Sequence, residues 1–140
     1  MLAHDPQRSG GSSNELRPPF ARKWHRLFPD DGIQSGVEPI ISGGKLFIGT
    51  LAGSLHALDT ETGKDLWTFG TGGRFCTPQQ VTAQISVYAG TEDMRVHALA
   101  LRNGRQIWTS EPLPGASMGG YHPVIAPDGS VLQSIQSVIN

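Results

Sequence analysis

Apolar residues occur along this chain in short runs that glycine- and proline-containing turns separate. Residues 45–50 and 54–59 are two such runs, and Ala52-Gly53 lies between them. Short apolar runs bounded by turn residues predict β-strands, and two runs joined by a short turn predict a hairpin. No stretch shows the sustained spacing of an amphipathic helix. The pattern therefore predicts an all-β fold.

The predicted strands form two consecutive groups of four, with further strands before and after them. The eight strands are expected at 37–41, 45–50, 54–59, 65–69, 77–81, 85–90, 95–101 and 105–109. A third group begins at 121–125 and continues into 131–132. Residues 22–28 alternate roughly and predict one more strand, which the turn at 30–32 closes. Residues 1–20 are polar, rich in turn formers and without periodicity, so they predict an extended arm.

The two groups of four are copies of each other. The offset is 41 residues at each anchor: Ala57 to Ala98, Gly63 to Gly104 and Trp67 to Trp108. A fixed period of about 40 residues indicates a repeat architecture, and four short strands in that length make one β-propeller blade. Trp24 precedes Trp67 by 43 residues and takes the same place in an incomplete earlier blade.

We therefore expect an all-β propeller fragment of four-stranded antiparallel blades, with about two full blades plus partial ones. The arm at 1–20 precedes propeller repeats over 21–140, with blade units at about 37–69 and 77–110. Two blades leave sheet faces uncovered and lack the caps that repeat proteins need. We interpret the chain as a piece of a longer propeller, and assembly of several copies into one ring is the open alternative.

One segment carries a specific family resemblance. Ala57-x-Asp59-x-x-Thr62-Gly63-x-x-x-Trp67 resembles the tryptophan-docking motif of the pyrroloquinoline-quinone (PQQ)-like β-propeller repeats. The resemblance implies that the indole stacks on the neighbouring blade and that the Asp and Thr tie down the turn. The second copy departs from the motif at Ala100 and Asn103, so its turn is expected to be less firmly tied.

The resemblance extends over residues 4 to about 132. Residues 4–10 resemble the Asp-Pro-x-Arg-Ser-Gly segment that often begins such proteins just after the signal peptide. The predicted structural anchors of the repeat are Gly49, Ala57, Asp59, Thr62, Gly63, Trp67, Gly90, Ala98, Gly104, Trp108 and Trp24. Small residues among them suit a close approach of neighbouring sheets, and the tryptophans supply buried area between blades.

Composition and charge exclude several classes of function. The 140 residues carry a net charge of −1, whereas a nucleic-acid footprint needs clustered basic charge. No apolar run approaches the ~18 residues that span a membrane, and the first residues lack the pattern of a signal peptide. A single cysteine, Cys76, excludes an internal disulfide and a cysteine-based zinc cluster.

The candidate chemical residues have structural explanations. His56 and His97 occupy equivalent positions in the two repeats, whereas a catalytic residue is needed once and not once per repeat. His4, His25 and His122 have no partner at metal-ligand spacing, so no catalytic or metal residue is predicted. Glu92-Asp93 is expected to be a solvated hairpin tip. The basic and aromatic residues at 22–26 are offset by the acidic pair at 30–31.

The name of the repeat does not by itself imply a quinone. The resemblance to quinoprotein dehydrogenases implies a calcium or lanthanide ligand set, a catalytic aspartate and often an adjacent-cysteine disulfide, and none of these can be placed in this sequence. We therefore predict no cofactor, because fold does not imply function. PQQ with calcium belongs only to the alternative function.

The sequence favours a non-catalytic role. We predict a binding or scaffold module of an exported protein, whose loops meet a protein or envelope component while the remaining blades of the parent complete the ring. The resemblance implies a periplasmic or cell-envelope location, and neither nucleic acid nor a membrane span is expected. The alternative is a fragment of a PQQ-dependent quinoprotein dehydrogenase that oxidises alcohols or sugars.

Overall fold

The computed structural model describes residues 17–33, 38–74, 80–82, 86–117, 123–126 and 128–135. Three antiparallel sheets make up this part of the chain, and no membrane-spanning helix occurs within it. Blade 1 contains β1 (Ile40–Ser42), β2 (Lys45–Gly49), β3 (Ser54–Asp59) and β4 (Asp65–Gly70). Blade 2 contains β5 (Gln80–Thr82), β6 (Ser86–Gly90), β7 (Val96–Ala100) and β8 (Gln106–Thr109). The third sheet pairs β9 (Val124–Ile125) with β10 (Val131–Leu132).

Blades 1 and 2 are built alike down to their irregularities. In each blade the strands pair in sequence order, as a meander. The pairing of the last two strands shifts register at Ala57/Leu58 in blade 1 and at Ala98/Leu99 in blade 2. Such a bulge increases the local twist of the strand that carries it. The sequence repeat therefore specifies the same distortion twice, as well as the same strands.

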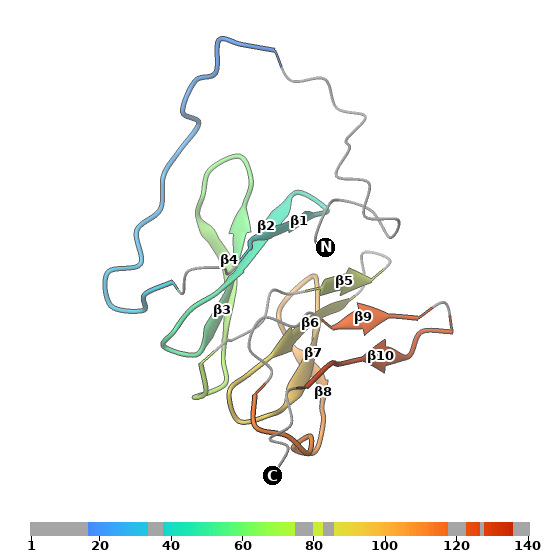
Figure 1. The fold of residues 1–140 in the computed structure, drawn as a ribbon. Helices are drawn as coiled ribbons and strands as arrows, with labels where there is room; N and C mark the ends of the chain where they lie inside the picture. Colours follow the sequence, from blue (N-terminus) through green and yellow to red (C-terminus); the bar gives the residue numbers. More distant parts are fainter. Residues whose placement is uncertain are drawn as a thin grey trace.

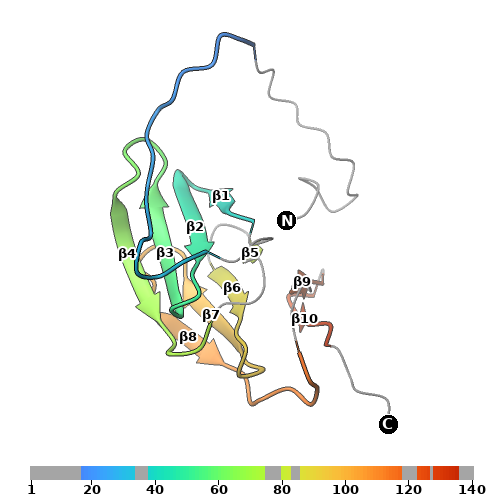
Figure 2. The same cartoon turned by 60° about the vertical axis from the view of Figure 1, so that its left-hand side comes forward.

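The sheets stand beside one another in chain order. The first strand of blade 2, β5, contacts the first strand of blade 1, β1, and also β9 of the third sheet. Figures 1 and 2 show the two four-stranded sheets side by side, with the β9–β10 pair beyond blade 2. Adjacent twisted sheets whose first strands meet are the arrangement of propeller blades. The predicted all-β propeller fold is confirmed.

The hydrophobic core lies between blades 1 and 2. Its buried members are Phe47, Leu55, Ala57, Val87, Ala89, Leu99 and Leu101, with Trp67 and Phe69 packed against them. Phe47, Ala57 and Trp67 face each other across β2, β3 and β4, so a small residue stands between two large rings. The rings of Phe47 and Trp67 lie 5.7 Å apart over this alanine. Burial of such side chains is the main favourable term that holds the two sheets together.

The N-terminal strap, which we define as residues 17–33, differs from the prediction. A strand was expected at 22–28, but none is assigned there and the segment has no strand partner among the described residues. Alternating side chains alone do not make a strand, because the backbone also needs a neighbour to pair with. The predicted turn is present at 29–31, where Gly32 donates its N–H to the carbonyl of Phe28. Figure 1 shows the strap running alongside blade 1.

Candidate functional site

Two histidines occupy equivalent places on the middle strands of the two blades. His56 lies opposite Thr68, and His97 lies opposite Thr109. Both side chains are buried, with 7% and 6% of the residue exposed. Each ring also meets an aromatic ring from the preceding unit: Phe28 at 5.0 Å for His56 and Phe69 at 5.9 Å for His97. The histidines are therefore part of the contact between successive units.

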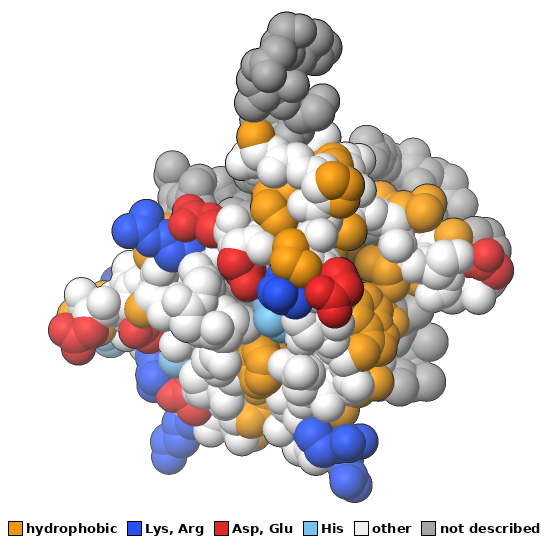
Figure 3. Space-filling view, turned by 90° about the horizontal axis from the view of Figure 1, so that it is seen from below, with side chains coloured by type: hydrophobic (Ala, Val, Ile, Leu, Met, Phe, Trp, Pro, Cys, Tyr) orange, Lys and Arg blue, Asp and Glu red, His pale blue; other side chains and the backbone are white. Residues whose placement is uncertain are grey.

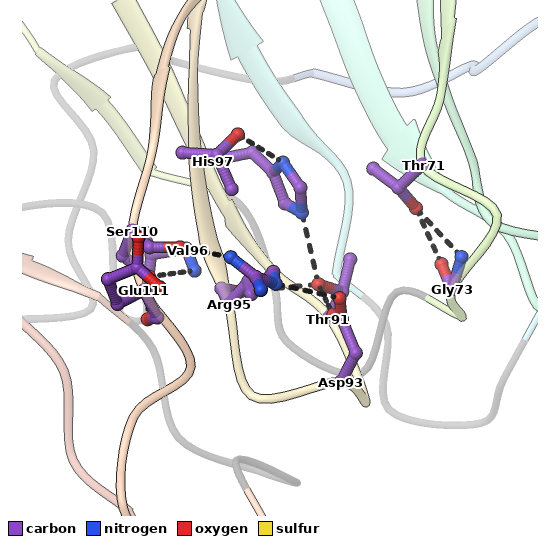
Figure 4. A network of polar contacts seen from close by, with 10 residues as sticks. Thr71, Gly73, Thr91, Asp93, Arg95, Val96, His97, Ser110 and Glu111 are labelled. Atoms are coloured by element: carbon purple, nitrogen blue, oxygen red, sulfur yellow. Dashed lines mark hydrogen bonds and ion pairs between the residues drawn. The ribbon is translucent and has the colours of Figure 1, made fainter.

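His97 is held between two hydroxyl groups. Its Nδ1 lies 3.0 Å from Thr109 Oγ1. Its Nε2 lies 3.1 Å from Thr91 Oγ1 (Figure 4). Hydroxyls both donate and accept, so a neutral imidazole with one proton satisfies both contacts. Burial lowers the pKa of His97, the charge of Asp93 raises it and the charge of Arg95 lowers it, with a net decrease. The ring is thus suited to be neutral.

The hairpin between β6 and β7 is fixed by a network around this histidine. The hydroxyl of Thr91 donates to Asp93, whose other oxygen lies 3.4 Å from Nε of Arg95. Arg95 also donates to the carbonyl of Ser110 at 2.8 Å, which ties the hairpin to the end of β8 (Figure 4). The expected hairpin tip at Glu92-Asp93 is exposed to solvent. The Asp93 carboxylate, which is half exposed, also accepts contacts from Thr91 and Arg95 within its own hairpin.

His56 meets carboxylates where His97 meets hydroxyls. Its Nδ1 lies 2.9 Å from Oδ1 of Asp65, and its Nε2 lies 3.3 Å from Oδ2 of Asp31 in the strap. Asp65 also pairs with Arg26. Burial raises the pKa of Asp65, but the hydrogen bond from His56 and the charge of Arg26 outweigh this and lower it overall. Four charged or titratable groups thus meet at this one junction of strap and blade.

Trp67 joins blade 1 to a turn of blade 2. Its Nε1 donates to the carbonyl of Leu101 at 3.2 Å. Its ring lies against Gly104, which has a φ of +70°, and a Cβ on that glycine would stand 2.5 Å from Cε3 of the indole. Only glycine both adopts this backbone conformation freely and leaves room for the ring.

Trp24 makes the equivalent contact from the strap to blade 1. Its Nε1 donates to the carbonyl of Thr60 at 2.9 Å, and its ring lies against Gly63. Gly63 also has a φ of +70°, and a Cβ there would stand 2.7 Å from Cδ2 of Trp24. Trp24 of the strap therefore makes the side-chain contacts that Trp67 makes from β4, the last strand of blade 1. The strap itself is not paired as a strand.

The two turns that receive these tryptophans differ in their side-chain bonds. Asp59 accepts hydrogen bonds from the N–H of Glu61 and from both the N–H and the hydroxyl of Thr62. The bonds from Thr62 lower the pKa of Asp59. In the second turn, Asn103 accepts one bond, from the N–H of Arg105. Both turns keep the same backbone closure, in which the glycine N–H donates over 2.8 Å to the carbonyl four residues earlier.

Trp108 has the same sheet position as Trp67 but a different environment. It lies opposite Ala98, and its ring is 5.9 Å from Tyr88, at 45°. The Phe47–Trp67 pair has nearly the same geometry, at 44°. Yet Trp108 is 39% exposed, and Ile107 beside it is 47% exposed. The predicted anchors Ala57, Ala98, Gly49 and Gly90 are all buried on the middle strands.

The remaining candidate residues are His4, His25, His122, Cys76 and the basic residues at 22–26. His25 is exposed, whereas His4, His122 and Cys76 lie outside the described residues. Of the basic residues at 22–26, Lys23 pairs with Glu61 and Arg26 with Asp65. No group of three or more potential metal ligands occurs within the described ranges.

The cluster of acidic and basic groups around His56 was not predicted from the sequence. The repeat identified His56, but its partner Asp31 lies in the strap, outside the two copies that align in register. A signal was present, because Phe28 precedes Phe69 by the repeat offset of 41 residues. That spacing places the strap against His56 and could have indicated the residues beside it.

Comparison with known proteins gives one family match. The family model described as outer membrane protein assembly factor BamB matches residues 8–134. A search of curated proteins found no significant match.

Solved structures of two kinds are similar to the chain. BamB from Moraxella catarrhalis is 24% identical, with a TM-score of 0.54, over 74% of this chain and 29% of that one. Quinohemoprotein alcohol dehydrogenase from Comamonas testosteroni is 21% identical, with a TM-score of 0.62, over 73% and 17%. The quinohemoprotein alcohol dehydrogenase ADHIIG from Pseudomonas putida HK5 is 20% identical, with a TM-score of 0.62, over 75% and 17%. The chain thus spans less than a third of each, and identities this low show the fold alone.

Proposed function

The chain belongs to the outer membrane protein assembly factor BamB family, and from this premise we propose that it is a non-catalytic propeller module that binds protein. The likeness to quinohemoprotein dehydrogenases is one of fold, and a fold hosts many functions. The contacts of individual residues in the two blades support the proposal.

The observation that carries the proposal is the repetition of the buried polar cluster. Each blade carries a histidine on its third strand, opposite a threonine of its fourth strand. An aromatic ring of the preceding unit packs beside each histidine. A group that performs chemistry is needed once, whereas a group that fixes the contact between units is needed at every unit. The most strongly buried titratable side chains of both blades therefore serve packing and orientation.

A binding role suits the loop ends of a rigid scaffold. The hairpin at 91–95 is held by Thr91, Asp93 and Arg95, so its backbone is fixed while its tip stays accessible. Figure 3, which views the lower end of Figure 1, shows acidic and basic side chains interspersed with hydrophobic ones. A mixed surface of this kind fits a protein partner better than a polyanion, which would require one sign of charge.

The family also supports a location. The family model is described as an outer membrane protein assembly factor, and on this basis we propose a periplasmic or cell-envelope location for this chain. Its partner would be a protein or another envelope component that meets the blade loops.

Site-specific cross-linking tests the binding role. A photo-reactive residue at Glu92, on the fixed hairpin, is expected to cross-link to envelope protein in intact cells. The same residue at Arg102, in the turn at the other end of the blade, is the matched control. Equal cross-linking at the two positions, or none at either, would contradict a loop-end binding surface.

The alternative is a piece of a PQQ-dependent dehydrogenase. Two quinohemoprotein alcohol dehydrogenases share the fold of this chain, so this function is tested directly. Addition of PQQ and calcium to the purified chain, followed by dye reduction with alcohols and sugars, separates the two functions. We expect no quinone-dependent reduction above the rate of free PQQ, and any such activity would overturn the non-catalytic proposal.

A further inference from the structure

His56 lies where three segments meet. Its ring stands on β3, one carboxylate reaches it from β4 at 2.9 Å, and another reaches it from the strap at 3.3 Å. The first carboxylate is Asp65 and the second is Asp31. The ring of Phe28, also from the strap, packs edge-on against the imidazole at 64°. Only 7% of His56 is exposed, so these contacts dominate its environment.

The hydrogen-bond partners of His56 favour a positively charged imidazole ring. Ionised carboxylates accept hydrogen bonds and do not donate them, and each ring nitrogen of His56 faces one. Both contacts are favourable only when both nitrogens carry a proton. The hydroxyl of Thr68, 3.3 Å from Nδ1, can act as donor or acceptor and does not alter this requirement. A cationic ring between two anionic groups is also the arrangement that Coulomb attraction favours in a buried site.

His97 is an internal control for this reading. Its two nitrogens face the hydroxyls of Thr109 and Thr91, which satisfy a neutral ring. His56 and His97 therefore occupy equivalent backbone positions but favour different protonation states, because their neighbouring side chains differ.

We propose that His56 is a pH-dependent clasp that holds the strap on blade 1. The clasp is closed while both ring nitrogens are protonated and Asp31 and Asp65 are ionised. When the ring releases one proton to solvent, a nitrogen lone pair faces a carboxylate oxygen, and one of the two contacts becomes repulsive. The regulated event is the separation of the strap from the blade.

The geometry indicates which contact opens first. Asp65 makes the shorter contact, to Nδ1, and is also paired with Arg26, so the proton on Nδ1 is the better held. Loss of the proton on Nε2 removes the hydrogen bond from His56 to Asp31, and Asp31 belongs to the strap. In acid, protonation of Asp65 would remove the contact to Nδ1, and the lowered pKa of Asp65 delays this loss.

Two backbone hydrogen bonds report on the clasp. The N–H groups of Leu51 and Ala52 donate to the carbonyls of Gly32 and Asp31, each over 3.0 Å. In blade 2 the equivalent bond runs from the N–H of Glu92 to the carbonyl of Arg74, over 2.9 Å. That bond lies beside His97 and provides the matched control.

The test is amide hydrogen exchange of the full chain at about pH 5.5 and about pH 8.5, corrected for the intrinsic pH dependence of exchange. Protection of Leu51 and Ala52 is expected to fall by about tenfold at the higher pH, the loss of one charge-assisted bond. Protection of Glu92 is expected to stay unchanged. Nitrogen chemical shifts of the His56 ring at the lower pH should show a proton on each nitrogen.

Two variants decide whether His56 is the cause. His56→Gln keeps a polar group but cannot gain a charge, and Asp31→Asn removes the strap's carboxylate; each is expected to abolish the pH dependence at Leu51 and Ala52. His97→Gln should leave it intact. The proposal is overturned if protection in the unmodified chain does not change with pH, or if the change persists in either of the first two variants.

Discussion

The two blades present the same face with different partners. In blade 1 the row Phe47, Ala57 and Trp67 is covered by blade 2, and Phe47 and Ala57 are completely buried. In blade 2 the equivalent row is Tyr88, Ala98 and Trp108, and the tryptophan is 39% exposed. The side-chain pairs have the same internal geometry, so the difference lies entirely in what stands opposite. The repeated sequence determines the structure within each blade, whereas the adjacent blade determines how much each of these residues contributes to stability.

The largest expected effect comes from removing the covered tryptophan. Trp67→Ala should lower the free energy of unfolding by about 3 kcal/mol, because it empties the space between the blades and removes the bond to Leu101. Trp108→Ala is the matched control and should cost about 1 kcal/mol or less, because its ring is already partly solvated. Urea unfolding followed by circular dichroism measures both. Equal losses in the two variants would show that coverage by the next blade does not distinguish the tryptophans.

The next effect separates backbone strain from contact with the ring. Gly104→Ala should destabilise by about 2–3 kcal/mol, because the new Cβ meets both an unfavourable φ and the indole of Trp67. Gly44→Ala has a similar φ, +72°, but nothing lies within 4 Å of its Cβ, so only the strain of about 1 kcal/mol is expected. Thermal unfolding of the two variants gives the difference. A Gly104→Ala variant no less stable than Gly44→Ala would mean that the indole is not against this turn in solution.

A pH effect sharpens the comparison of the two histidines. Because burial lowers the pKa of His97, the unfolded chain takes up a proton there more readily than the folded chain. Stability is therefore full above the ordinary histidine value of 6.5 and falls as the pH drops through it toward the lower folded pKa. Urea midpoints across this range measure the loss, and His97→Gln should reduce it. A slope that His97→Gln leaves unchanged would assign the loss to other groups.

The smallest expected effect concerns the two turns. Asp59→Ala removes three accepted hydrogen bonds, whereas Asn103→Ala removes one, so the first variant should show the larger decrease in melting temperature. The contribution of Asp59 should decrease as the pH falls from its ordinary value of 3.8 and be lost once the pH is below its folded pKa, which is lowered. Equal decreases at neutral pH would contradict the reading that the first turn is the more firmly tied.

The sequence predicted the elements that repeat and missed those that do not. Ser54–Asp59 has the predicted bounds, and the offset of 41 residues placed Gly104 and Trp108 in equivalent turns and strands. Residues 22–28 of the strap were predicted as a strand because their side chains alternate, and alternation does not show whether the backbone has a strand to pair with. Asp31 was missed because its contact with His56 has no counterpart in blade 2, where Nε2 of His97 faces Thr91.

Hydrogen exchange of the three indole N–H groups tests the central claim most directly. Each resonance can be assigned by a single Trp→Phe substitution. The account predicts slow exchange for Trp24 and Trp67, whose Nε1 atoms donate to the carbonyls of Thr60 and Leu101, and fast exchange for Trp108 on the open face of blade 2. Exchange of Trp67 as fast as that of Trp108 would contradict the account, because the two blades would then not differ in what covers them.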